Sequence, residues 1–335
     1  MHNKTVGIIG AGDIGLNLAE ILALKGYNIL LHNRYHAVDD KPSPYWLSKM
    51  GKVMDMNDSL QLPGCGVVKL TSDLNELKTS TFLVITAGAK RTNPEETREE
   101  LAGKNAKIIH TYIDFLIDNP SFLTLIISNP VDSLTQYLIE KIAEKTAKPV
   151  TEISKKIVGV SYIDSMRLKN LVKEFLVEHH PTLQNASIEA IAIGEHGPSM
   201  VPLISSVFID GRPLSDFASQ EQIDYIAEHT ILRGNDIIKL TGASSIMGPA
   251  HAVMYMIEEI NSKAEAIIPC SVWDGKRAIG RMAKFTKNTF DHIVDIDLNN
   301  YEKDMLEKSE KSLDKQYETI LNLLSLTNTV NDAPL

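Results

Sequence analysis

The chain has 335 residues, of which 43% are hydrophobic and 23% charged, as expected of a globular protein with one large or two medium domains. Its net charge of -9 argues against a nucleic-acid partner, which would require a basic surface. No apolar stretch reaches the roughly 20 residues that cross a bilayer, so no membrane partner is expected. The first residues run directly into a strand-like pattern, which predicts a cytoplasmic protein, or an organellar one if a presequence is missing.

The first half of the chain alternates short apolar runs with helical patterns. Thr5–Ile9 predicts a strand, Gly10–Gly15 a turn, and Leu16–Lys25 a helix that ends at Gly26. Further strands are predicted at Asn28–Leu31, Val67–Leu70, Phe82–Thr86 and Leu123–Ser128, and further helices at Glu96–Asp118 and Asp132–Thr146. Buried strands separated by helices indicate an α/β fold with a Rossmann-type, doubly wound parallel sheet.

After Pro149 the pattern becomes that of an α+β domain. The predicted elements are a strand at Ile157–Val160, an antiparallel pair at Ile188–Ile193 and Val201–Ile209, and helices at Ile163–Glu178, Glu221–Leu240, Ala250–Ile260 and Tyr301–Leu324. We therefore expect a dinucleotide-binding domain over residues 1–150, a catalytic domain over 151–328 and a flexible tail over 329–335.

The glycine-rich turn predicts a dinucleotide cofactor. Gly10 allows a tight turn, Gly12 lets a pyrophosphate approach the main chain, and Gly15 lets the helix pack closely on the strand. Asp13 and Ile14 lie at the start of that helix, whose N-terminus favours an anion. The alternative is a turn that holds three glycines by chance.

The end of the second predicted strand bears on the choice between NAD and NADP. An acidic residue there would bind the adenosine ribose of NAD, but the sequence has Asn33 and Arg34. Asn33 can still bind a ribose hydroxyl, and Arg34 can bind a 2′-phosphate. NAD is the expected cofactor, NADP remains open, and a solvated arginine without a role is the alternative for Arg34.

Five further motifs follow in order: Ala87-Gly88-Ala89-Lys90-Arg91, Arg98, Ser128-Asn129-Pro130-Val131-Asp132, Asp164-Ser165-Met166-Arg167 and Gly194-Glu195-His196-Gly197. With the glycine turn, this ordered set resembles the lactate and malate dehydrogenase family over residues 4 to 325. The resemblance implies a homodimer or homotetramer that oxidises a 2-hydroxy acid reversibly by hydride transfer to a nicotinamide cofactor.

The resemblance also assigns the catalytic residues. His196 corresponds to the acid and base, and Asp164 to the carboxylate that orients its ring. Arg167 corresponds to the arginine that grips the substrate carboxylate, for which a planar guanidinium is well suited. The alternatives are a structural histidine and a surface ion pair.

Other positions match family residues around the cofactor and substrate. Arg98 resembles the arginine on the loop that closes over the site, and Asn129 the asparagine near the nicotinamide and the substrate hydroxyl, with a turn-capping amide as the alternative. Ala87, Gly88 and Asn105 occupy cofactor-binding positions of the family.

The second loop arginine favours the malate branch and hence the tricarboxylic acid cycle. Arg91 lies where malate-type members carry a partner for the distal carboxylate of the substrate, although its loop is one residue longer than usual. Pro198 replaces the aspartate common in the lactate branch. We also expect Ser244, or Ser245, to contribute a hydroxyl to the pocket.

Three other functions are alternatives to a malate dehydrogenase. An L-lactate or broader 2-hydroxy-acid dehydrogenase would use the same catalytic residues. An NAD-requiring glycosidase would need a metal held partly by cysteine, but Cys65 and Cys270 lie far from the motif residues, lack metal-ligand spacing and are expected to be reduced thiols. A dinucleotide-binding protein without catalysis would not need the histidine motif.

Overall fold

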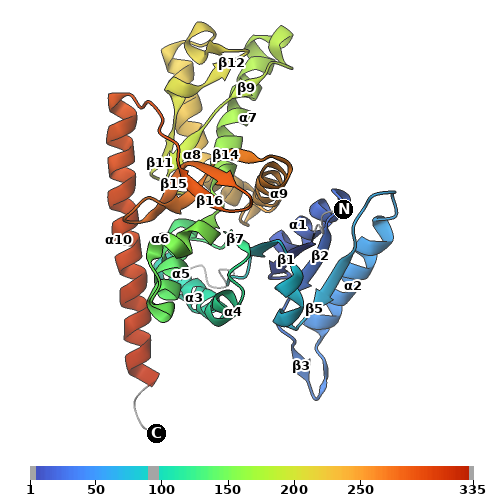
Figure 1. Ribbon diagram of the computed structural model, residues 1–335. Helices are drawn as coiled ribbons and strands as arrows, with labels where there is room; N and C mark the ends of the chain where they lie inside the picture. The colour runs from blue at the N-terminus through green and yellow to red at the C-terminus, as the bar shows by residue number, and fades with distance from the viewer. Residues whose placement is uncertain (1–4, 90–97, 332–335) are drawn as a thin grey trace.

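The centre of the molecule is an eleven-stranded sheet flanked by helices (Figure 1). The computed structural model describes residues 5–89 and 98–331, apart from the side chains of Arg98 and residues 326–331. Six strands are parallel, in the order β5-β2-β1-β6-β7-β8, which confirms the expected doubly wound sheet. They are β1 (Thr5–Ile9), β2 (Asn28–His32), β5 (Val68–Thr71), β6 (Phe82–Ile85), β7 (Leu123–Ile126) and β8 (Ile157–Gly159).

Helices cover both faces of this parallel part. They are α1 (Asp13–Leu24), α2 (Pro44–Ser59), α3 (Arg98–His110), α4 (Ile113–Asp118), α5 (Val131–Thr146) and the short α6 (Val150–Ile153). The apolar side chains of α1 pack on one face, in a core shared with α9 (Met247–Ser262). Those of α3, α4 and α5 form a second core on the other face. A small hairpin, β3 (Ala37–Val38) and β4 (Lys41–Pro42), projects from the end near α2.

Antiparallel strands extend the same sheet beyond β8. They are β14 (Glu265–Trp273), β15 (Ala278–Thr286), β16 (Phe290–Ile293), β10 (Ala192–Gly194) and β11 (Met200–Pro202). A separate three-stranded sheet contains β9 (Ile188–Glu189), β12 (Phe208–Ile209) and β13 (Arg212–Pro213). This sheet packs with α7 (Tyr162–His179) and α8 (Gln220–Thr241) around a third apolar core.

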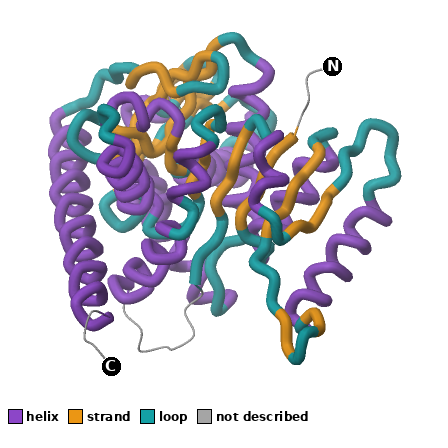
Figure 2. Tube along the Cα trace, turned by 60° about the horizontal axis from the view of Figure 1, so that its bottom comes forward, coloured by secondary structure: helices purple, strands orange, loops and turns teal. Residues whose placement is uncertain are grey.

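The last helix, α10 (Asn300–Asn331), runs along one side of the molecule (Figures 1 and 2). Leu313, Tyr317 and Ile320 are buried against the body of the protein, and Ile320 belongs to the core that includes α3 and α5. The helix ends at Asn331, within the segment expected to be a tail.

Two predicted elements differ from the structure. The helix predicted over Glu96–Asp118 is divided into α3 and α4, because the amides of Thr111 and Tyr112 bond three residues back and end the first helix. The pair predicted at Ile188–Ile193 and Val201–Ile209 is antiparallel, but its residues are divided between two sheets: β10 pairs with β11, and β9 with β12.

Helix α2 and the three strands β14, β15 and β16 were not predicted from the sequence. Helix α2 has apolar residues around most of its circumference, with Trp46 and Val53 buried and Leu47 and Met54 exposed, so no single apolar stripe marks it. Pro269 in β14 and Gly280 in β15 interrupt the strand patterns.

The described residues contain neither a candidate membrane span nor a candidate metal site. No helix among them is both long and apolar enough to span a bilayer. Within the same residues, no group of three histidine, cysteine or acidic side chains could hold a metal ion.

Candidate active site

Three predicted motifs meet at the carboxyl edge of the parallel strands. The Gly10 turn follows β1, Ala87 follows β6, and Asn129 follows β7. Thr86 Oγ1 donates a hydrogen bond to the Gly10 carbonyl over 2.9 Å, and Ser128 Oγ donates to the Ala87 carbonyl over 2.7 Å. These bonds join three neighbouring loops at the edge where ligands bind in open α/β sheets.

The glycine turn has the space that a dinucleotide needs. Gly10 has φ +116°, in the region that favours glycine, and a Cβ at Gly15 would lie 1.8 Å from the Gly10 carbonyl oxygen. A Cβ at Gly12, in contrast, would meet nothing within 4 Å. Helix α1 begins at Asp13, and Ile14 packs against the core, so amides at a helix N-terminus border an open space beside Gly12. The turn therefore fits a pyrophosphate.

The structure gives Asn33 a place beside this turn. Its side-chain oxygen accepts a hydrogen bond from the Ala11 amide over 3.4 Å, and its Nδ2 donates to the Arg34 carbonyl over 3.2 Å. Arg34 is exposed. Asn33 thus holds the glycine turn from β2, a structural role that the sequence did not reveal.

Asn105 joins the loops that follow β6 and β7. It is 4% exposed on α3; its Oδ1 accepts from the Ala89 amide, and its Nδ2 donates to the Asn129 carbonyl, each over 2.7 Å. A Cβ at Gly88 would lie 3.2 Å from the Asn105 Oδ1. One side chain therefore fixes the spacing between the loops that follow β6 and β7.

His196, Asp164 and Arg167 are brought together in one buried cluster. His196 Nδ1 lies 2.7 Å from Asp164 Oδ2, and Arg167 Nη1 donates to Asp164 Oδ1 over 3.1 Å. The side chains are 17%, 4% and 13% exposed, respectively. Asp164 and Arg167 project from one face of α7, as their three-residue spacing predicts.

The surroundings of His196 favour its charged form. Burial lowers the pKa of the imidazole, but the charge and hydrogen bond of Asp164 and the charge of Asp132 raise the pKa above its usual value, against the opposing charge of Arg167. His196 lies two residues after Gly194, the last residue of β10, whose φ is +82°. A histidine held as an imidazolium in a largely buried site is suited to donate a proton.

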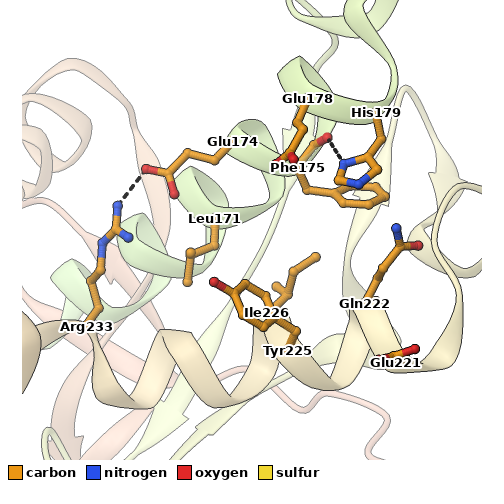
Figure 3. Close-up of a pocket in the computed structure, with 10 residues that line it drawn as sticks. All are labelled: Leu171, Glu174, Phe175, Glu178, His179, Glu221, Gln222, Tyr225, Ile226 and Arg233. Carbon is orange, nitrogen blue, oxygen red and sulfur yellow. Dashed lines mark hydrogen bonds and ion pairs between the residues drawn. The ribbon is translucent and has the colours of Figure 1, made fainter.

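Arg167 lies against the backbone of α8. A Cβ on Gly234 would be 3.3 Å from both Nη atoms, so only a residue without a side chain lets the helix come this close. The adjacent Arg233 bonds Glu174 of α7 over 2.6 Å and borders a cavity of about 300 Å³ between the two helices (Figure 3). The Glu174–Arg233 ion pair thus links α7 and α8 beside Gly234.

Asp132 is a buried carboxylate of the Asn129-Pro130 motif for which the sequence predicted no role. It lies in the first turn of α5, after the cis peptide bond between Asn129 and Pro130. Its Oδ2 accepts a hydrogen bond from the His196 backbone amide over 2.7 Å. No sequence spacing links residues 132 and 196, so only the fold reveals this contact.

The remaining predicted residues are not brought into this cluster by any described contact. Ser244 is exposed in the loop between α8 and α9, while the neighbouring Ser245 lies near Gly248, whose Cβ would meet Ile163. Asn129 is exposed, with its carbonyl bound by Asn105. Arg91 lies outside the described residues, and Arg98 is the first residue of α3, but its side chain lies outside them too.

Two family models match the chain. Residues 4–152 match the NAD binding domain of lactate/malate dehydrogenase, and residues 162–324 match the α/β C-terminal domain of the same family. Malate dehydrogenase 1 of Aquifex aeolicus is 30% identical over 341 residues, covering 96% of this chain and 97% of that protein. Malate dehydrogenase of Aliarcobacter butzleri is 30% identical over 336 residues, covering 96% and 99%.

Solved structures of the family share the fold of the whole chain. Malate dehydrogenase of Cryptosporidium parvum has a TM-score of 0.80 at 27% identity, covering 96% of this chain and 99% of that one. Lactate dehydrogenase of the same organism, complexed with lactic acid and nicotinamide adenine dinucleotide, has a TM-score of 0.80 at 25% identity over 100% of both chains. This chain therefore belongs to the lactate/malate dehydrogenase family and is an oxidoreductase that acts on the CH–OH group of a 2-hydroxy acid.

Proposed function

We propose that this protein is a malate dehydrogenase that interconverts (S)-malate and oxaloacetate with NAD. The observation that carries the proposal is the cluster in which Asp164 binds both His196 and Arg167, over 2.7 and 3.1 Å. The cluster combines a proton donor, the Asp164 carboxylate that orients it, and a guanidinium that can bind the carboxylate of a substrate.

The proposed chemistry assigns each group one task. The bound nicotinamide supplies or accepts the hydride. His196 uses Nδ1 to bind Asp164, which leaves Nε2 to give a proton to the keto oxygen during reduction and to take it back during oxidation. Reduction thus turns C=O into CH–OH and leaves a neutral imidazole. Arg167 binds the carboxylate next to the reacting carbon through paired hydrogen bonds.

The choice of malate over lactate depends on the second carboxylate of the substrate. We assign Arg91 as the residue that binds this second carboxylate. Arg98 would close over the keto group, and Asn129 and Ser244 would line the site. The malate dehydrogenase names of the relatives from Aquifex aeolicus and Aliarcobacter butzleri support the assignment. The full-length match to a lactate dehydrogenase makes L-lactate, or a broader set of 2-hydroxy acids, the second candidate.

NAD is the proposed cofactor because the N-terminal family model is an NAD binding domain. Gly10, Gly12 and Gly15, with Asp13 and Ile14, would hold the pyrophosphate. Asn33 would hold the adenosine ribose, and Ala87, Gly88, Asn105 and Asn129 the nicotinamide side. Exposed Arg34 is the residue that would bind the 2′-phosphate if NADP were used.

A two-by-two kinetic matrix tests substrate and cofactor together. Oxaloacetate and pyruvate are each assayed with NADH and NADPH, and kcat/KM should be highest for oxaloacetate with NADH. A higher value for pyruvate would replace malate by lactate as the substrate, and a preference for NADPH would assign Arg34 to the cofactor. Arg91→Gln should reduce kcat/KM for oxaloacetate selectively, by about 2 to 4 kcal/mol of transition-state stabilisation for one charged contact.

His196→Asn tests the chemical step itself. The variant should bind NADH with the affinity of the wild type, measured by fluorescence titration, while turnover is abolished. Asn keeps a side chain that can hydrogen-bond to Asp164 but cannot carry a proton near neutral pH. Full activity in this variant would remove His196 from the mechanism.

We also propose that the protein is a homodimer or homotetramer. Helix α2 supports this, because Tyr45, Leu47, Met50 and Met54 are exposed apolar side chains along it. Light scattering coupled to size exclusion measures the mass directly. A particle of 37.1 kDa would show that the chain is a monomer.

A further inference from the structure

Two buried carboxylates approach His196 from different helices. Asp164 of α7 binds the ring, and Asp132 of α5 accepts the backbone amide of the same residue over 2.7 Å. Asp132 is 2% exposed, and the Ser271 hydroxyl of β14 faces its carboxylate. The catalytic loop is therefore held at two points, by two groups that carry a negative charge when ionised.

A purely structural role does not account for an acid at residue 132. An asparagine would accept the same bond from the His196 amide without the cost of burying a charge. His196 is the cationic group whose charge stabilises the Asp132 carboxylate. The charge of Asp132 in turn favours the imidazolium form of His196.

The charges around the imidazole explain why a second carboxylate is useful. Asp164 shares its charge with Arg167, which bonds its other oxygen over 3.1 Å and itself disfavours the imidazolium. The formal charges of Asp164 and Arg167 cancel, so without Asp132 the ring would face little net negative charge. With Asp132 ionised, this group of three carries one net negative charge.

We propose that Asp132 is a positioning residue that anchors the His196 loop and supplies the charge that keeps the imidazole protonated for reduction. The inference rests on the proposed role of His196 as proton donor. It assigns no contact between Asp132 and the substrate.

The groups that face Asp132 are consistent with an ionised carboxylate at neutral pH. The pKa of Asp132 is raised to about 6: burial raises it most, the Ser271 hydroxyl of β14 and the amide and ring of His196 lower it, and the charge of Glu195 raises it. Glu195 is itself buried and accepts a hydrogen bond from Ser312 of α10 over 3.2 Å. Above about pH 6 the carboxylate of Asp132 is thus available to favour the imidazolium.

Asp132→Asn isolates the charge, because the amide oxygen can still accept the His196 amide. The His196 pKa, followed by NMR of the imidazole in the enzyme without substrate, should be lower than in the wild type. For oxaloacetate reduction, kcat/KM should fall at high pH as His196 loses its proton. In the variant this fall should occur at lower pH, in parallel with the His196 pKa. An unchanged His196 pKa in this variant would overturn the inference.

Asp132→Ala isolates the anchor. It should lower kcat by about ten- to a hundredfold, the usual consequence of a misplaced catalytic group, with little change in KM because Asp132 does not touch the substrate. Asp132→Asn keeps the anchor, so at a pH where His196 is protonated in this variant its kcat should be close to that of the wild type. Ser133→Ala is the matched control: this buried neighbour bonds Gln316 of α10 instead, and its loss should leave the pH profile unchanged. Equal kcat values in Asp132→Ala and the wild type would contradict the anchor.

The wild-type protein provides a readout that does not depend on any variant or on turnover. Carbon-detected NMR of the side-chain carboxyl groups should show Asp132 ionised over the pH range in which His196 loses its proton. A carboxyl that stays protonated through that range would overturn the inference. If His196→Asn retained turnover, the proposed function would fail, yet these titrations would still decide whether Asp132 and His196 are coupled.

Discussion

Gly234 of α8 packs directly against the guanidinium of Arg167, since a Cβ on Gly234 would lie 3.3 Å from both of its terminal nitrogens. A glycine in the middle of a long helix weakens that helix by roughly 0.5 to 1 kcal/mol relative to alanine. The protein tolerates this cost where the backbone of α8 forms a wall behind the arginine. The position of Arg167 is therefore set by Asp164 on one side and by the α8 backbone on the other.

Gly234→Ala should separate helix stability from substrate binding. Alanine favours the helix, but its methyl group displaces the guanidinium by a few tenths of an ångström, so KM for the keto acid should rise. We expect a loss of about 1 to 2 kcal/mol in kcat/KM, the usual scale of overpacking. Gly51→Ala in α2 is the matched control, because a Cβ there meets nothing within 4 Å. It should stabilise the protein without changing KM, and an equal KM in both variants would contradict the role of Gly234.

Asn105→Ala should weaken both the fold and cofactor binding. The variant leaves the Ala89 amide and the Asn129 carbonyl without their shared partner, which should cost about 2 to 4 kcal/mol of unfolding free energy in urea titrations. NADH affinity, measured by fluorescence, should fall because the loops after β6 and β7 lose their fixed spacing. Asn119→Ala, which removes one bond to the Phe115 carbonyl, should leave NADH affinity unchanged. Unchanged NADH affinity in Asn105→Ala would show that the loops hold without it.

Substitutions of two glycines in the glycine turn should have different effects. Gly15→Ala forces a methyl group to within 1.8 Å of the Gly10 carbonyl oxygen, so the turn must open and the melting temperature should fall. Gly12→Ala meets open space and should fold with near wild-type stability, but it should bind NADH more weakly because its methyl group occupies the approach to the main chain. Wild-type NADH affinity in Gly12→Ala would place the pyrophosphate elsewhere.

Asp132→Asn should stabilise the folded protein in a pH-dependent way. The folded pKa of Asp132, about 6, lies above its ordinary value of 3.8, so the folded state keeps a proton that the unfolded chain releases, and this contribution is lost as pH rises from about 4 to 6. The variant should therefore gain about 1 to 3 kcal/mol of unfolding free energy over the wild type at pH 8, and little at pH 4. Urea denaturation at both pH values measures the difference, and a gain of equal size at both would argue against a buried charge.

His196 contributes to the pH dependence of stability with the same sign. Its folded pKa is raised, so its stabilising effect is complete below the unfolded value of 6.5 and is lost as pH rises through the folded pKa. Stability differences between the wild type and His196→Asn should therefore shrink from pH 6 to pH 9, which the same urea titrations measure. A difference that grows with pH would contradict the sign.

Local signals determined much of the fold and part of the site. The β1–Gly10–α1 segment carries strand, turn and helix signals within about twenty residues, and the three-residue spacing of Asp164 and Arg167 puts both on one face of α7. Local sequence patterns did not predict the strands whose formation depends on pairing with distant strands. β14 contains Pro269 and β15 contains Gly280, yet β14 pairs with β8 and β15, and β15 pairs also with β10, which makes both of them strands.

The sequence by itself determined which side chains could carry out the chemistry and which turn could hold a dinucleotide, because backbone sterics and helical spacing act between neighbours in the chain. Only the tertiary structure decided that Asp132 meets the backbone of His196, that Asn105 bridges two loops, and that Gly234 lies behind Arg167. Those contacts join residues 16 to 67 positions apart in the chain. Their geometry follows from how sheet and helices pack, which no local pattern encodes.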